Sequence, residues 1–353
     1  MINITQEQIM QNWSVKNAEN PLVSIRCITY NHEPYIAQAL DGFLMQKTNF
    51  PFEIIVHDDA STDNTATIIR EYEKKYPLII KAIYETENQY SKKDGSLGRI
   101  MNAATKGKYI AFCEGDDYWI DENKLQMQVD FLEANSDYGL CYTQVKYYYQ
   151  TTDSFDPNEY SKEIVDYKDL LKNGNSITTL TVFIKSELLF KYSMDEEIQL
   201  ASRNWLMGDY PLWIFCTYHS KPKFFPNVTS VYRVLEESAS HFKSNIKNIL
   251  FRKNVLDIIE FFCKKYNFNE SNFKDKDSIL IGYCRISLLN SYDKETADYL
   301  INLINKQKKI SKKDKIWKIF VYNKFTYYSL YIFIKFYLAI KNRYIHKNEN
   351  LVL

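Results

Sequence analysis

Three carboxylates follow one short apolar segment of this chain. Residues 113–119 read CEGDDYW, which places Glu114, Asp116 and Asp117 directly after the apolar residues 109–113. Carboxylates this close together repel one another unless a cation lies among them. Mg²⁺ and Mn²⁺ prefer oxygen ligands and bridge to substrate phosphates, so the cluster predicts a divalent metal site for a phosphorylated substrate. A solvated acidic loop or a helix start is the alternative.

Polar residues also follow two earlier apolar segments. NHEP comes after residues 22–30, and HDDASTD comes after residues 52–56. Asp58 or Asp59 could accept hydrogen bonds from a base or a ribose. In the alternative interpretation, this loop only caps the next helix through Asp63 or Thr62.

Three single residues are further candidates. Arg99, in SLGRIMNAATKG, is expected near a helix N-terminus, where it could hold a phosphate; a surface arginine is the alternative. Asp209 lies between aromatic and apolar neighbours in WLMGDYPLW, a setting that raises a carboxylate pKa and suits a general base. A helix cap before Pro211 is the competing explanation. His241 could bind a metal or a phosphate, or be an ordinary loop residue.

The segments between these clusters alternate between strand and helix patterns. Strands are predicted at 22–30, 52–56, 78–84, 109–113 and 139–147, with helices at 35–45, 62–76, 97–105 and 121–135. This alternation predicts an α/β fold with a mostly parallel central sheet flanked by helices. Ligands bind beyond the carboxyl ends of such strands, so the polar clusters should meet at one edge.

Beyond residue 150 the alternation weakens. A loop is predicted at 151–163, strands at 176–185 and 228–234, and helices within 204–219, 245–266 and 274–290. The chain of 353 residues, 45% hydrophobic, suffices for one large domain with additions or two smaller ones. The six scattered cysteines form no CxxC pair, which argues against zinc and for reduced core residues in a cytosolic protein. The N-terminus lacks the pattern of a signal peptide.

The net charge of +1 hides an uneven distribution. Twelve Lys and Arg but only one acid lie in residues 306–347, a local charge of +11; the other residues carry 33 bases and 43 acids, or −10. The aromatic segment 317–340 has lysines too near its middle for a membrane span, but it suits the headgroup layer of an anionic membrane. A terminal helix packed on the protein, or a homodimer contact, is the alternative. Nucleic-acid binding fits poorly, because the basic residues lie in a hydrophobic tail.

Taken in order, four segments resemble a family-2 glycosyltransferase of the GT-A fold over about residues 21–241. They read VSIRCITYNHEPYIAQALDGFLMQ, FEIIVHDDASTDNT, LGRIMNAATKGKYIAFCEGDDYWIDENKLQMQ and GDYPLW…VYRV. The resemblance implies a Rossmann-like GT-A catalytic domain at 1–240, with a nucleotide-binding half at 21–118 and an acceptor half at 119–240. A helical C-terminal region would occupy 241–353, including the basic aromatic tail 306–347.

The resemblance also implies an activity. Family members transfer a sugar with inversion from a nucleotide diphosphate donor, most often UDP, to a hydroxyl group. Bacterial members commonly build O-antigen, capsule or other polysaccharide on lipid-linked acceptors. The expected localisation is therefore cytoplasmic, peripheral at the inner face of the bacterial plasma membrane. If the donor is an α-linked nucleotide sugar, inversion predicts a β-linked product.

Residue roles follow from the same resemblance. Thr29 and Glu33 would flank the nucleotide, Asp58 and Asp59 would contact the uracil and ribose, and Arg99 a phosphate. Asp116, with Asp117 and Glu114, would hold Mn²⁺ or Mg²⁺, although Glu114 stands where the family motif has its first Asp. Asp209 would be the catalytic base. Leu235 occupies the histidine position of the Tyr-Arg-x-His motif, and His241 is the candidate to replace that histidine.

Two other classes of protein share some of these features. A nucleotidyltransferase has the same α/β sheet and paired acids, but it should carry a glycine-rich and basic loop after the first strand. ITYNHEPYI has neither feature. A catalytically inactive sugar-nucleotide-binding or membrane-binding protein is the second alternative, and intact Asp116 and Asp209 argue against it. The sequence leaves the donor sugar, the acceptor and the linkage open.

Overall fold

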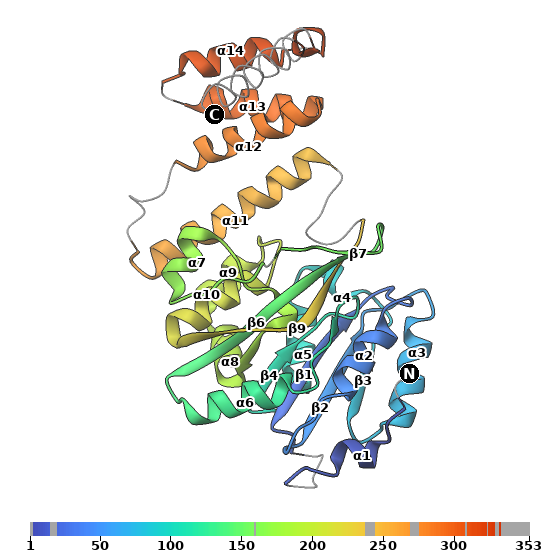
Figure 1. The fold of residues 1–353 in the computed structure, drawn as a ribbon. Coiled ribbons are helices and arrows are strands. Elements are labelled where there is room, and N and C mark those ends of the chain that lie inside the picture. The colour runs from blue at the N-terminus through green and yellow to red at the C-terminus, as the bar shows by residue number, and fades with distance from the viewer. Residues whose placement is uncertain are drawn as a thin grey trace, which may run out of the picture. The chain divides into compact units, whose positions relative to one another are not determined.

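The computed structural model describes residues 3–14, 20–158, 160–236, 244–268, 275–307, 309–322, 324–328 and 332. The chain divides into two compact units, residues 1–236 and 237–353, each of which is described by itself (Figure 1). The functional roles assigned above to residues 1–240 and 241–353 stay predictions.

The first unit is built on a nine-stranded sheet with the order β3-β2-β1-β4-β8-β6-β9-β5, in which β7 pairs with β6. The strands are β1 (Val23–Thr29), β2 (Phe52–Asp58), β3 (Ile80–Tyr84), β4 (Tyr109–Phe112), β5 (Tyr118–Trp119), β6 (Tyr138–Tyr149), β7 (Ser154–Phe155), β8 (Phe183–Lys185) and β9 (Lys221–Val234). Its helices are α1 (Gln6–Met10), α2 (Ile36–Leu44), α3 (Thr65–Lys75), α4 (Gln89–Lys92), α5 (Ser96–Ala104), α6 (Lys124–Ala134), α7 (Tyr167–Asn173), α8 (Ser186–Met194), α9 (Glu196–Ser202) and α10 (Asp209–His219). The α/β prediction is confirmed.

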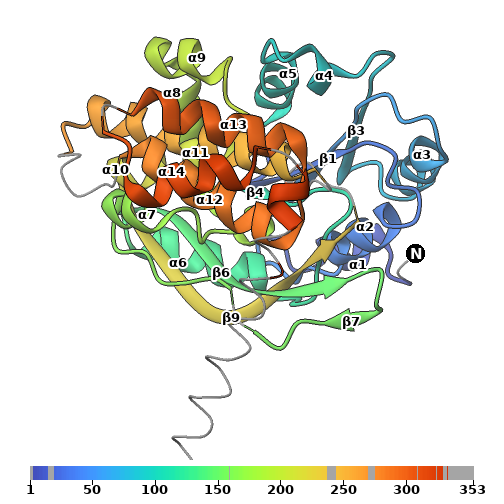
Figure 2. The ribbon, with the colours of Figure 1, turned by 90° about the horizontal axis from the view of Figure 1, so that it is seen from above.

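The first four strands form the parallel part of the sheet. β1 pairs in parallel with both β2 and β4, and β2 pairs in parallel with β3. All seven residues of β2 are buried, as expected for a strand covered by helices on both faces. The chain steps outward from β1 to β3 and then returns to β4, so α2 and α5 lie on opposite sides of the sheet (Figure 2). The strand order therefore reverses between β1 and β4, where α/β sheets bind their ligands.

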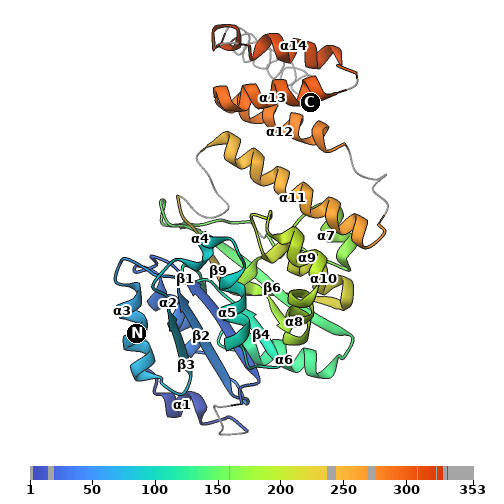
Figure 3. The same ribbon diagram turned by 180° about the vertical axis from the view of Figure 1, so that it is seen from behind.

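The second half of the sheet is mixed, where the sequence predicted a mostly parallel arrangement. β8 runs antiparallel to both β4 and β6, and β5 runs antiparallel to β9. The long strands β6 and β9, labelled in Figure 3, are parallel neighbours. Antiparallel strands need no helical crossover between them, so the alternation of strand and helix patterns in the sequence does not predict antiparallel pairing. The predicted strand 176–185 is in fact a 3₁₀ turn, η1 (Thr179–Thr181), followed by the short β8.

One hydrophobic core joins both halves of the first unit. Phe43 of α2 packs edge-on against Trp119 of β5 with a ring separation of 4.9 Å, and Tyr109 of β4 stacks on Phe183 of β8 at 5.3 Å. At Gly42 an added Cβ would lie 2.9 Å from the carbonyl oxygen of Trp119. Glycine is required there because helix and strand backbones approach so closely.

The second unit is helical where the structure describes it. Its helices are α11 (Asn245–Lys265), α12 (Lys276–Asn290), α13 (Lys294–Lys306) and α14 (Lys312–Phe320). A core of its own is formed by Leu280, Cys284, Leu300, Ile304 and Trp317, among others. Across the described residues, we find no helix with the length and apolar character needed to cross a membrane. All six cysteines of the chain are buried.

Candidate functional site

The loop after β4, which carries Glu114, Asp116 and Asp117, lies against the end of β1, where NHEP follows. The backbone NH of Cys113 donates to the Arg26 carbonyl at 3.1 Å, and that of Gly115 donates to the Ile28 carbonyl at 3.0 Å. A Cβ on residue 115 would lie 2.6 Å from Thr29 Oγ1 and 2.8 Å from Thr29 Cβ. Only glycine fits this approach, which holds Asp116 beside the end of β1.

The three carboxylates of this loop differ in their surroundings. Asp116 is 22% exposed, and its Oδ2 lies 4.0 Å from Nε2 of His32. Burial, the charge of Asp116 and, more weakly, that of Asp209 raise the pKa of Glu114 to about 7. Asp117 is buried; burial and its acidic neighbours raise its pKa, while its Oδ1 accepts the backbone NH of Arg233 at 2.7 Å. Asp116 is therefore the carboxylate of this loop best placed to meet a ligand.

Arg233 of β9, the strand that pairs with β5, fixes the acidic loop. Its Nε donates to the backbone carbonyl of Asp116 at 2.8 Å, and its two terminal nitrogens donate to Gln150 and Gln38 at 2.6 Å each. The guanidinium also lies over the rings of Tyr35, Tyr118 and Tyr148, at 4.7, 5.2 and 5.5 Å. With its donors and both faces engaged, Arg233 is a positioning residue for Asp116.

Three buried polar atoms near this loop have no hydrogen-bond partner within the part of the chain that the structure describes. They are Thr29 Oγ1, His32 Nδ1 and Asp58 Oδ1. Thr29 and Asp58 end the adjacent strands β1 and β2 and face each other in the parallel register. Buried polar groups are normally hydrogen-bonded, so three orphans at one sheet edge indicate that a polar ligand completes them.

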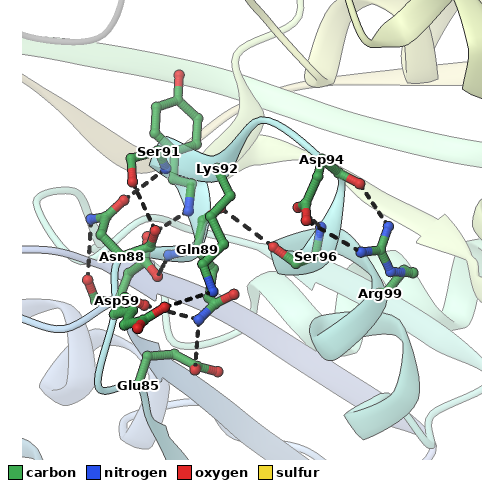
Figure 4. Close-up of polar contacts among 11 residues, drawn as sticks. Asp59, Glu85, Asn88, Gln89, Ser91, Lys92, Asp94, Ser96 and Arg99 are labelled. Carbon is green, nitrogen blue, oxygen red and sulfur yellow. Dashed lines mark hydrogen bonds and ion pairs between the residues drawn. The ribbon is translucent and has the colours of Figure 1, made fainter.

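Asp59 and Arg99 are occupied by contacts within the protein (Figure 4). The carboxylate of Asp59 accepts the backbone NH groups of Gln89 and Tyr90, at 2.6 and 3.0 Å, at the start of α4. Arg99 is 66% exposed and donates to the Asp94 carbonyl at 2.7 Å. Both residues organise the segment between β3 and β4, and their predicted contacts with a nucleotide stay predictions.

Glu33 joins the loop after β1 to the loop after β2. Its carboxylate accepts from the backbone NH of Asn64 at 3.1 Å and from the Asn64 side chain at 2.8 Å. Its own NH donates to Asp63 at 3.1 Å. In this structure Glu33 therefore holds the two loops together, and its predicted role beside a nucleotide stays a prediction.

Asp209 begins α10, and its carboxylate is partly buried. Thr179 of η1 donates its hydroxyl hydrogen to Asp209 Oδ2 at 3.1 Å. Burial raises the pKa of Asp209, whereas hydrogen bonds from the backbone NH of Tyr210 and from Thr179 oppose that rise. Because the Asp209 charge acts on Glu114, the base candidate and the acidic loop share one electrostatic environment.

Buried side chains hold the turn η1 in place. The carbonyl of Leu180 accepts from Trp119 Nε1 at 2.9 Å and from Ser230 Oγ at 3.3 Å. The carbonyl of Thr181 accepts from Gln128 Nε2 at 3.0 Å and from Lys124 Nζ at 3.4 Å. Thr179 is thereby presented to Asp209 from the rigid core of the first unit.

Lys124 is an unusual part of this support, because its ammonium group is fully buried. Its Nζ lies 2.8 Å from Gln128 Oε1 and 4.5 Å from the centre of the Trp119 ring, and burial lowers its pKa to about 8. Between pH 8 and 10.5 the unfolded chain therefore binds one more proton than the folded chain, so stability rises with pH.

We expect Lys124→Met to abolish this gain. From pH 7 to pH 10.5 the free energy of unfolding of the wild type should rise by about 3 kcal/mol relative to that of the variant. Urea titrations of both proteins at several pH values measure the difference. Parallel pH profiles would show that Lys124 keeps its ordinary pKa in the folded protein.

The described residues contain no group of three His, Cys, Asp or Glu side chains able to hold a metal ion by themselves. Asp116 and His32 offer at most two ligands. Mg²⁺ and Mn²⁺ are commonly held by one or two carboxylates together with waters and substrate phosphates. Burial and, after it, the charge of Asp116 raise the pKa of Glu114, so a cation beside these two carboxylates would be favoured. The donor set fits an ion bound together with a diphosphate, while direct ligation by Asp117 or Glu114 stays a prediction.

His241 lies outside the described residues, so its metal role stays a prediction. Sequence reasoning missed the functions of Arg233, Thr179 and His32. The motif NHEP after the first strand includes His32. The contact of Thr179 with Asp209, thirty residues later, has no local sequence signal.

The strand order of the sheet, which reverses between β1 and β4, defines a GT-A fold. The acidic loop and the carboxylate of Asp209 form a site for a polar ligand on this fold. Solved structures agree with this fold. The first 349 residues of TarS from S. aureus, crystallised with UDP, superimpose with a TM-score of 0.53 and 19% identity; the match covers 80% of this chain and 78% of that crystallised chain.

Residues 24–198 match the model of Glycosyl transferase family 2, and the chain belongs to this family. An uncharacterised protein of Mycobacterium tuberculosis is 44% identical over 131 residues, which is 36% of each chain. The E. coli protein WfaP, a UDP-Glc:alpha-D-GlcNAc-diphosphoundecaprenol beta-1,3-glucosyltransferase, is 28% identical over 67% of this chain and 86% of its own length. The chain thus matches little more than a third of the mycobacterial relative.

Proposed function

We propose that this protein is an inverting glycosyltransferase that moves a sugar from a nucleotide diphosphate donor, a UDP-sugar, to a hydroxyl group of a glycan or lipid-linked acceptor in bacterial surface polysaccharide synthesis. The observation that carries the proposal is the meeting of the Asp116 loop with the buried unpartnered atoms of Thr29 and Asp58 at the ends of adjacent strands, together with an Asp209 near enough for its charge to act on Glu114. WfaP, whose name gives UDP-Glc and a diphosphoundecaprenol acceptor, supports the choice of donor and acceptor class.

Each part of the site has a step to perform. The Thr29 hydroxyl would exchange a hydrogen bond with the nucleoside of the donor, and the Asp58 carboxylate would accept one from it. Asp209 would take the proton of the acceptor hydroxyl, whose oxygen then bonds to the anomeric carbon while the bond from that carbon to the diphosphate oxygen breaks. Attack from the face opposite the leaving group inverts the anomeric configuration.

A divalent ion held by Asp116 would neutralise the charge that develops on the departing diphosphate. Arg233 holds the backbone of the acidic loop, which fixes where the Asp116 carboxylate lies before the donor arrives. Because the loop is braced in advance, little reorganisation is needed on binding.

The donor is tested by a nucleotide-release screen. The full chain with Mn²⁺ is offered UDP-, GDP- and dTDP-sugars, with and without a diphosphoundecaprenol-linked acceptor analogue. We expect metal-dependent release from one UDP-sugar, stimulated by the acceptor. If every donor gives no release and no thermal stabilisation, the transferase proposal is wrong. Stabilisation by a donor without turnover on any acceptor would favour the inactive binding protein, and pyrophosphate release from a nucleoside triphosphate a nucleotidyltransferase.

The hydrogen bond from Thr179 gives this proposal a pH signature. Because this bond favours the ionised form of Asp209, its loss in Thr179→Val should raise the Asp209 pKa further. A base must be deprotonated to act, so the acid limb of kcat/KM against pH should move to higher pH in the variant. Thr217→Val, which removes a hydroxyl farther along α10, is the matched control and should keep the wild-type profile. An unmoved acid limb in Thr179→Val would remove Asp209 as the titrating base.

We further propose that the protein works at the inner face of the plasma membrane, where lipid-linked acceptors are available. The local charge of +11 in residues 306–347 supports this placement. Most residues beyond 328 of the predicted membrane-binding tail lie outside the described part of the chain.

A further inference from the structure

The helix α14 has two sides of different character. Asp314, Trp317 and Phe320 face inward and are buried in the second unit. Ile316 and Ile319 are 57% and 70% exposed. Just beyond the helix, Tyr322 and Phe325 are exposed by 78% and 81%. Large apolar side chains exposed this closely together mark an interaction surface on soluble proteins.

Charge is divided between the same two sides. Lysines occupy exposed positions through this segment: Lys312, Lys313, Lys315 and Lys324. Asp314 is the one acidic residue of the sequence from 306 to 324. It points inward, where it forms an ion pair with Arg285 and closes the helix N-terminus with Ser311. The acid is thus compensated inside the unit, and the exposed side is left with positive charge.

Helical spacing brings the exposed lysines and isoleucines together. At 100° per residue, Lys312, Lys315 and Ile319 lie about 140–160° around the helix from Trp317, and Ile316 lies beside them, about 100° from Trp317. We define these four residues as the outward face of α14. Its pattern is aliphatic side chains beside lysines, without acidic residues.

We propose that the outward face of α14 binds the surface of an anionic lipid bilayer, with the helix lying in the plane of the interface. The apolar side chains would enter the boundary between headgroups and acyl chains. The lysines would keep their ammonium groups among the lipid phosphates, since long cationic side chains reach back to the interface. An acidic protein surface would match the lysines but not the two exposed isoleucines, so the charge and the apolar pattern together favour lipid.

This inference deepens the proposed function by naming the surface that would bring the site to a lipid-linked acceptor. It rests on that function for its purpose, but membrane binding itself requires neither donor nor turnover. A failure of membrane binding can therefore be distinguished from a failure of the transferase proposal.

The experiment is co-sedimentation of the full chain with vesicles of phosphatidylcholine alone or with about 30% phosphatidylglycerol, without nucleotide. We expect binding to the anionic vesicles only, weakening as NaCl rises from about 0.05 to 0.5 M. Lys312→Glu/Lys315→Glu and Ile316→Ser/Ile319→Ser should each lower the partition coefficient at least about tenfold. Near-UV circular dichroism and thermal melting check that the variants are folded.

Matched controls use exposed residues of the first unit. Lys74→Glu/Lys162→Glu and Met194→Ser/Leu200→Ser make the same changes elsewhere and should bind like wild type. Equal binding by folded wild type and both α14 variants would overturn the proposal, because the attachment would then lie elsewhere in the chain. Absence of vesicle binding, together with a dimer that dissociates in Ile316→Ser/Ile319→Ser, would assign the face to a second copy.

Discussion

Asp209→Asn should lower kcat for sugar transfer by about 10³-fold while leaving the affinity for the donor nearly unchanged. General-base catalysis contributes about 10²- to 10⁴-fold, and an amide of the same shape cannot take the acceptor proton. The hydrogen bond from Thr179 can be kept, because the Asn carbonyl oxygen also accepts. Single-turnover transfer rates and donor titration by calorimetry measure the two quantities separately.

Asp166→Asn is the matched control for this substitution. Asp166 caps α7 by accepting the backbone NH of Lys168 at 2.8 Å, and asparagine caps helices equally well. The control should keep full activity. If Asp209→Asn stays within tenfold of wild type, another group must accept the proton, and the assignment of Asp209 as base is wrong.

Asp116→Asn should abolish metal-dependent binding of the donor. We expect donor affinity in the presence of Mn²⁺ to fall at least about 100-fold, because the carboxylate best placed to meet the ion becomes neutral. Without metal, wild type and variant should bind the free nucleoside equally, since the orphaned atoms of Thr29 and Asp58 are untouched. Calorimetric titrations with and without Mn²⁺ make the comparison.

The same substitution should not destabilise the protein. The charge of Asp116 helps to raise the pKa values of both Glu114 and Asp117, so its removal relieves repulsion within the loop. The melting temperature of the variant without ligands should equal or exceed that of wild type. A lower melting temperature, with loss of binding also in the absence of Mn²⁺, would identify Asp116 as a structural residue.

Asp117→Asn separates two roles within the acidic loop. The Asn side chain can still accept a hydrogen bond from the backbone NH of Arg233, so this hydrogen bond is kept while the negative charge of residue 117 is lost. If Asp117 ligates the metal as the resemblance implies, its variant should lose Mn²⁺-dependent binding like Asp116→Asn. Preserved binding would leave Asp116 as the metal ligand of the pair.

Local patterns were enough to predict the parallel half of the fold. The apolar segments that became β1, β2 and β4 are each followed by polar residues, and strand-helix alternation restricts such segments to right-handed crossovers. The carboxyl ends of parallel neighbours must then lie at one edge. For this reason the sequence predicted that NHE, HDDASTD and EGDD, which follow these strands, lie at the same edge.

The antiparallel additions and the internal contacts of the site were decided by tertiary structure. β8 and β5 are only three and two residues long, too short to carry a pattern that fixes their partners or direction. The engagement of Asp59 by the start of α4 likewise depends on how a loop thirty residues away folds back. The partners of the Asp59 carboxylate are backbone NH groups, which every residue except proline carries. No residue type in the sequence therefore indicates this contact.

Sequence alone thus determined the kinds of groups in the site and the sheet edge at which they gather, because both follow from local periodicity and chain direction. Tertiary structure decided which polar side chains hydrogen-bond within the protein and which are available to a ligand. Arg233 reaches the acidic loop from more than a hundred residues away, and Thr179 reaches Asp209 only because buried side chains hold η1. Such contacts are selected by packing of the whole core, where no single segment carries the information.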